Sequence, residues 1–275
     1  MIRKRSIAPA GVTGPGADPP ARLRSRLILR EALAALARNA RALLAPAALA
    51  AGACAVFEYM VLGWLPGGGP DVTTRSVLLS ALAAALLATP LLTTAGRAFC
   101  RINGVTFLRA QGLMLGAVLW FAGRSLLVCL PLIVLTVVEV GFLTAIGVGA
   151  GVGRQSSDLL VSAVIAAIPV LLIGYGTAAA FLTRYLLALP AAASGTRLSL
   201  AASAALLRGN RLRIAWLVAL PALIAGAIHV APFLTDDPPL AAAALLFGVA
   251  DALGLAAIAF ILAAAYQHFA PCARA

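Results

Sequence analysis

Charged side chains are scarce in this chain. Only 11% of its 275 residues are charged, whereas 63% are hydrophobic; a soluble domain has about 25% charged residues. A soluble protein of this size has to cover its outside with polar groups. The composition therefore excludes an ordinary water-soluble domain and predicts that lipid surrounds most of the chain.

Several residue types needed for catalysis or metal binding are also few. The chain has two histidines, His229 and His268, which lie far apart and form no HExxH motif or neighbouring Ser-His-Asp set. Its four cysteines show no CxxC or Cys/His spacing, so neither a disulfide framework nor a zinc site is indicated. We expect no enzymatic activity, no cofactor and no bound metal.

The net charge of +12 does not predict a nucleic-acid partner. Nucleic-acid-binding proteins gather Lys and Arg on a soluble face. Here the basic residues stand in short blocks between apolar runs of about twenty residues, the length that crosses a bilayer. The pattern is typical of membrane topology, and no nucleic acid is expected.

Six apolar stretches are long enough to cross a membrane. They are Ala42–Leu65, Val77–Ala95, Ser125–Val148, Leu159–Thr183, Ile214–Leu234 and Leu240–Tyr266. We predict an all-α polytopic membrane protein with one six-helix domain over residues 21–275, preceded by a disordered, Gly- and Pro-rich cytoplasmic tail over residues 1–20. The apolar segment Gly112–Gly123 is interpreted as a helix along the interface, because a longer span would bury Arg124 near mid-membrane.

The distribution of basic residues predicts the orientation. Of the 21 Lys and Arg residues, only Arg75 and Arg154 lie in the connections on one side of the six predicted spans. Cytoplasmic connections carry the excess of Lys and Arg. Both termini are therefore expected in the cytoplasm, and the heavy use of Ala, Leu and Arg favours a bacterial inner membrane.

The spans repeat in pairs. Three similar segments each place an arginine before a proline-containing span: Arg41 and Pro46, Arg124 and Pro131, Arg213 and Pro221. The repeating unit would be a cytoplasmic interfacial helix, an outward span and a returning span. The sequence thus predicts three repeated hairpins, an arrangement that transporters often show but that other membrane proteins share.

Arginines on the cytoplasmic side could bind anionic lipid headgroups. In Leu23–Arg41, Leu29, Leu33, Leu36 and Ala40 recur at helical spacing, which is typical of an amphipathic helix in the headgroup plane. Ser199–Arg208 is similar, and Gly209-Asn210 predicts a left-handed stop after it. The candidate headgroup contacts are Arg22, Arg24, Arg26, Arg30, Arg38, Arg41, Arg208, Arg211 and Arg213. Topology and anchoring alone also explain them, and we favour that explanation.

The segment Arg184–Ile214, RYLLALPAAASGTRLSLAASAALLRGNRLRI, resembles a bacterial family of six-span membrane proteins. These are uncharacterised proteins related to the membrane domain of some glycerophosphodiester phosphodiesterases. The matching positions are Arg184, Pro190, Gly195, Leu198, Ser203, Leu206, Arg208, Gly209, Asn210 and Arg213, whereas Ala204, Leu207 and Leu212 stand where that family tends to have aromatics or Thr. The resemblance implies a fold and a location in the membrane, but no phosphodiesterase activity, because no catalytic domain is attached here.

Ionisable groups inside the spans are the candidate polar site. Such residues are costly in lipid and often functional. Asp251 lies well inside the sixth span, where it would hold a proton or cation, or else bond a neighbouring helix through Ser80, Tyr175 or Thr177. Three further groups, Glu58, Glu139 and His229, follow the repeated arginines at similar depth. They would form a shared site, or else lie at helix ends that reach headgroup water, which we favour.

These patterns leave two functions open. We favour a non-catalytic scaffold, assembly or lipid-interacting subunit of the inner membrane, with anionic lipid and possible protein partners or further copies of itself. The alternative is a small transporter or permease that uses Asp251. Water access to Asp251 would separate the two, since a scaffold needs none.

Overall fold

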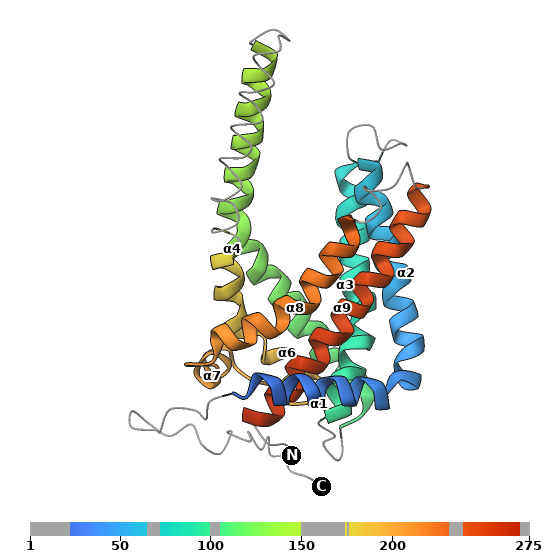
Figure 1. The fold of residues 1–275 in the computed structure, drawn as a ribbon, viewed down its shortest axis with the longest axis vertical. Coiled ribbons are helices and arrows are strands. Elements are labelled where there is room, and N and C mark those ends of the chain that lie inside the picture. Colours follow the sequence, from blue (N-terminus) through green and yellow to red (C-terminus); the bar gives the residue numbers. More distant parts are fainter. Residues whose placement is uncertain are drawn as a thin grey trace, which may run out of the picture. The chain divides into compact units, whose positions relative to one another are not determined.

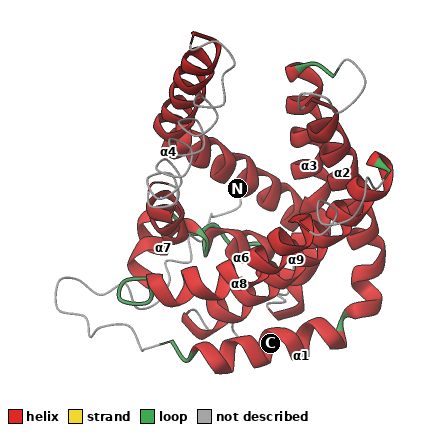
Figure 2. Cartoon of the chain, turned by 45° about the horizontal axis from the view of Figure 1, so that its top comes forward, coloured by secondary structure: helices red, strands yellow, loops and turns green. Residues whose placement is uncertain are grey.

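A computed structural model describes residues 23–64, 72–99, 105–149, 174, 176–230 and 239–269. These residues form helices joined by short turns, with no strand among them (Figure 2). The chain divides into two compact units, one made of Met1–Val118 with Arg184–Ala275 and the other of Leu119–Thr183. Each unit is described by itself.

The larger unit holds most of the helices. They are α1 (Ser25–Arg38), α2 (Ala40–Trp64), α3 (Thr74–Phe99), the first part of α4 (Phe107–Gly149), α6 (Ala188–Ala193), α7 (Leu200–Leu206), α8 (Arg211–Val230) and α9 (Leu240–Phe269). A short 3₁₀ turn, Thr183–Tyr185, precedes α6.

Five helices among the described residues are long and apolar enough to cross a membrane: α2, α3, α4, α8 and α9. The prediction of an all-α protein with several membrane-spanning helices is confirmed to that extent. The predicted fourth span, Leu159–Thr183, is described only at residues 174 and 176–183. A sixth crossing and the three repeated hairpins therefore stay predictions.

Helix α9 is the centre of the larger unit. It packs against α1, α2, α3, α6 and α8, and most of its buried residues are alanines. At Gly248 the backbones of α9 and α2 come closest, because a Cβ there would lie 2.4 Å from the Ala55 nitrogen and 2.5 Å from the Ala51 oxygen. Small residues let apolar helices approach closely in this way.

Helix α1 lies across one end of the bundle (Figure 1), which we call the α1 end. Its buried residues, Ile28, Ala32 and Ala35, recur at helical spacing on the face packed against the bundle. The apolar stripe seen in the sequence lies about a quarter turn away, and its Leu33 is 53% exposed. The predicted helix is present, but a different stripe packs against the protein.

Asn210, just before α8, and Arg213, in the first turn of α8, hold the segment that leads into α1. The Leu23 N–H donates to Asn210 Oδ1 at 2.9 Å, and Arg213 Nη1 donates to the Leu23 carbonyl at 3.0 Å. Asn210 is 1% exposed, and Gly209 before it has φ +79°. The left-handed stop predicted at Gly209 is confirmed, and it presents Asn210 to a segment almost two hundred residues away.

Helix α4 begins against α3 through a polar network. Thr93 Oγ1 donates to Gln111 Oε1 at 2.8 Å, and Gln111 Nε2 donates to the Thr89 hydroxyl. Ala110 and Met114, on either side of Gln111, are fully buried. Because α4 continues without a break to Gly149, the separate interfacial helix predicted over Gly112–Gly123 is wrong: this segment is the first part of a longer helix.

The length of α4 explains the difference. Its 43 residues would rise about 65 Å, twice the roughly 30 Å of hydrocarbon, so only part of it can cross. In the smaller unit, Arg124 lies over the Trp120 ring at 5.3 Å. Such an Arg–Trp pair suits a membrane–water interface, although the helix itself does not break there.

Candidate functional site

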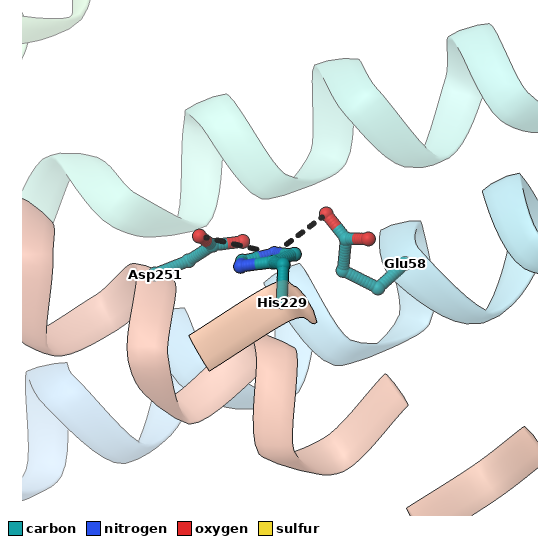
Figure 3. Close-up of side chains that lie close together, drawn as sticks. All are labelled: Glu58, His229 and Asp251. Carbon is teal, nitrogen blue, oxygen red and sulfur yellow. Dashed lines mark ion pairs between the residues drawn. The ribbon is translucent and has the colours of Figure 1, made fainter. Parts of the chain in front are cut away.

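Three ionisable side chains from three helices of the larger unit meet in one place (Figure 3). His229 of α8 lies between Asp251 of α9 and Glu58 of α2, with Nε2 at 3.6 Å from Asp251 Oδ1 and 3.8 Å from Glu58 Oε1. One ligand atom of each residue lies within 4.8 Å of the other two. We call these residues the Glu-His-Asp site.

The packing of α2 on α9 places the two carboxylates along one seam. Gly248 of α9 touches the α2 backbone at Ala51 and Ala55. Asp251 shares a helix face with Gly248, and Glu58 shares one with Ala55, because residues three apart lie on the same face. The two helices run in opposite directions (Figure 1), so the carboxylates lie on opposite sides of this contact along the seam, and His229 of α8 lies between them.

Two contacts fix the orientation of the His229 ring. Its Nδ1 lies 2.8 Å from the Ala225 carbonyl oxygen, one turn earlier on α8. The ring also stacks on Phe247, with centroids 4.3 Å apart and planes 17° apart. With Nδ1–H donating to the carbonyl, Nε2 presents its lone pair to the two carboxylates.

The carboxylates are near Nε2 without being hydrogen-bonded to it. Distances of 3.6 and 3.8 Å exceed the about 2.7–3.2 Å of an N–H···O bond. The side chains of Glu58, His229 and Asp251 are 14%, 27% and 29% exposed, so the site is open on one side. Within the described part of the chain, no Lys or Arg forms an ion pair with either carboxylate.

The site lies below the helix ends that are opposite α1. At 1.5 Å per residue, Glu58 is about 9 Å along α2 from its end at Trp64, and Asp251 is about 16 Å along α9 from its start at Leu240. His229 is the penultimate residue of α8. Helix α8 therefore ends level with the middle of α9, and the site is at a depth that hydrocarbon occupies if the five helices span a bilayer.

The structure brings together three of the four predicted polar residues. Asp251 meets His229 rather than Ser80, whose hydroxyl donates to the Val77 carbonyl of its own helix. Thr177 belongs to the other unit, and Tyr175 lies outside the described residues. The side chain of Glu139 also lies outside them.

The nine candidate headgroup arginines have different surroundings. Arg24, just before α1, is exposed, as are Arg26, Arg30 and Arg38 of α1. Arg41 and Arg208 are exposed too, whereas Arg211 and Arg213 are half-buried and Arg22 lies outside the described residues. Arg213 already donates to Leu23. Exposure leaves six of these guanidinium groups accessible to lipid.

Buried Cys54 is the nearby residue that sequence reasoning did not connect with this site. It lies one turn before Glu58 on the same side of α2. No family model, curated protein or solved structure matches the chain. What the site does is therefore argued from its own chemistry: it can accept protons at three groups, and it can hold a cation between two carboxylates and an imidazole.

Proposed function

We propose that this chain is a multi-pass protein of the bacterial inner membrane, with six spans in three hairpins and both termini in the cytoplasm. The arginines of α1 and those at the starts of α2 and α8 gather at the α1 end, whereas Arg75 begins α3 at the opposite end. This asymmetry supports a cytoplasmic α1 end. Within the segment that resembles the six-span family, Asn210 holds Leu23, which leads into α1.

Of the two functions that the sequence leaves open, we propose the permease, which moves a cation or couples its transport to one. One observation carries this proposal: Glu58, His229 and Asp251 converge from three helices at membrane depth. A charge in hydrocarbon is costly, and proteins retain such groups mainly along ion and proton pathways.

The scaffold is the second candidate, and a different observation favours it. Leu23 is clamped by Asn210 and Arg213, which ties the amphipathic helix α1 to the bundle. A fixed helix with exposed Arg26, Arg30 and Arg38 suits binding to anionic lipid or to an acidic partner. Neither candidate requires catalysis, a cofactor or nucleic acid.

Charge movement in reconstituted membranes separates the two candidates. The full chain in proteoliposomes would be adsorbed on a solid-supported membrane and exposed to rapid jumps of pH and of Zn²⁺ concentration. A permease gives a transient current on at least one jump, because the cation enters a site inside the membrane. We expect Asp251→Asn to remove most of that current, since the change removes one negative charge and keeps the size of the side chain.

The matched control is Glu31→Gln, which removes an exposed carboxylate from α1, outside the candidate spans. It should leave the current unchanged. A folded wild-type protein that gives no current on either jump would contradict the permease and leave the scaffold as the better proposal.

A further inference from the structure

The Glu-His-Asp site has the ligand set of a metal centre. We propose that Glu58, His229 and Asp251 bind a divalent transition-metal ion of the zinc class. The inference rests on the proposed function in using the same three side chains, and it names the cation that the permease takes.

The spacing of the ligand atoms is the first argument. Ligands held about 2.0–2.2 Å from a tetrahedral zinc ion lie about 3.3–3.6 Å from one another. The two Nε2–carboxylate distances, 3.6 and 3.8 Å, are slightly larger than this and longer than hydrogen bonds. All three ligand atoms lie within 4.8 Å of one another, so the two carboxylates have to move inward by about 1 Å or less to reach one tetrahedral centre.

The orientation of His229 is the second argument. Histidines that bind metals usually donate their other ring N–H to a carbonyl or carboxylate, which fixes the tautomer. His229 has this arrangement, with Nδ1 at 2.8 Å from the Ala225 carbonyl and Nε2 between the carboxylates. The stacked Phe247 ring holds the plane of the imidazole.

Charge balance is the third argument. Two carboxylates and a neutral imidazole carry a charge of about −2, which a divalent cation neutralises completely and a single proton does not. In a lipid environment, an uncompensated buried charge is strongly unfavourable. No Lys or Arg of the described residues pairs with either carboxylate, so the negative charge has to be removed by protons on these three groups or balanced by a bound ion.

The ligand types select the class of metal. Imidazole suits zinc and its first-row neighbours, whereas magnesium and calcium prefer ligand sets made of oxygen alone. Three protein ligands also leave at least one position open, unlike the closed four-ligand sites of structural zinc. An open position lets water or the next ligand exchange, which a transported ion requires.

Metal binding to the purified full chain tests the site directly. The chain would carry an affinity tag without histidine and would be titrated with ZnCl₂ in detergent, followed by calorimetry and metal analysis. We expect one Zn²⁺ per chain. Co²⁺ should bind at the same place and give the visible absorption of a low-coordinate complex with a nitrogen ligand.

The two histidines of the chain provide a matched pair of variants. His229→Gln should weaken Zn²⁺ binding by more than the about 10- to 100-fold that loss of an outer hydrogen-bond partner costs. His268→Gln removes an exposed histidine at the end of α9 and should bind like wild type. Asp251→Asn gives a second, size-conserving test if His229→Gln does not fold.

The outcomes distinguish this inference from the proposed function. A folded wild-type protein that binds neither Zn²⁺ nor Co²⁺ at micromolar concentrations, or equal binding by His229→Gln and His268→Gln, would overturn the metal site. Proton-driven currents without metal binding would leave the permease standing and reject the metal. Zinc binding without any current would support the site and reject the permease.

Discussion

At the scale of single residues, hydrogen bonds from polar side chains connect particular helices of this apolar protein. Asn210 and Arg213 hold Leu23, while Gln111 joins α4 to Thr89 and Thr93 of α3. Apolar contacts between helices are not specific in lipid, because lipid tails are equally apolar. Each polar contact therefore helps to decide which helix faces which.

Replacing Asn210 should release α1 from the bundle. Asn210→Ala leaves the buried Leu23 N–H without its acceptor, which costs about 1–3 kcal/mol. We expect a lower unfolding temperature in detergent and faster trypsin cleavage at the arginines of α1. The control is Asn39→Ala, since the Asn39 side chain donates to the Ala35 carbonyl of the helix that it ends; equal cleavage of the two variants would argue against the clamp.

At the scale of elements, α9 positions the helices packed around it because its small side chains let them approach closely. Alanines and Gly248 bring the α2 backbone against it, and the same contact sets the register in which Asp251 and Glu58 share a seam. Helix α1 packs across the end of this bundle through Ile28, Ala32 and Ala35. The geometry of the Glu-His-Asp site thus depends on Gly248, which contributes no functional group to the site.

Adding one methyl group at Gly248 should separate α2 from α9. The new Cβ of Gly248→Ala would lie 2.4–2.5 Å from α2 backbone atoms, which cannot move independently. Overpacking of this kind costs about 1–3 kcal/mol, and it should also weaken any Zn²⁺ binding by displacing Asp251.

Gly226 of α8 provides the comparison, because a Cβ there meets nothing within 4 Å. Thermal unfolding of both variants in the same detergent measures the difference. If Gly248→Ala is as stable as Gly226→Ala, the close helix contact is not a constraint on this fold.

At the scale of the whole molecule, the asymmetry of basic residues is the feature from which we propose the orientation of the chain. Helix α1, which carries Arg26, Arg30 and Arg38, lies across the α1 end (Figure 1). Because α4 is about twice as long as a bilayer is thick, the topology depends on which part of it crosses. The Arg124–Trp120 pair favours an interface near the middle of that helix.

Reporter fusions along the chain test the complete topology. Fusions after Arg109, Arg211 and Arg274 should report the cytoplasm, and fusions after Pro70, Ser156 and Asp237 the periplasm. Alkaline phosphatase and fluorescent-protein reporters give opposite signals at each point and so serve as mutual controls. A periplasmic reporter signal after Arg274 would reject the six-span arrangement.

The sequence by itself determined that lipid surrounds the helices, where most of the long helices lie, and where the turn before α8 occurs. Long apolar runs specify helices because unpaired backbone groups are too costly in lipid, so α2, α3, α8 and α9 begin and end within a few residues of the predicted spans. Gly209 was predictable for a local reason, since glycine adopts the positive φ of the turn between α7 and α8 at no steric cost. The break before Arg124 was predicted wrongly, because one charge in a long helix does not stop it.

Only the tertiary structure decided which faces meet. In a water-soluble helix, the polar side marks the exterior, but here the lipid is as apolar as the packed interior, so periodicity does not identify the buried face. That is why Ile28, Ala32 and Ala35, rather than the leucine stripe, pack against the bundle. It is also why only part of the Glu-His-Asp site was readable from spacing. The repeated arginines suggested a shared site that includes Glu58 and His229, but the pairing of His229 with Asp251 depends on how α8 packs on α9.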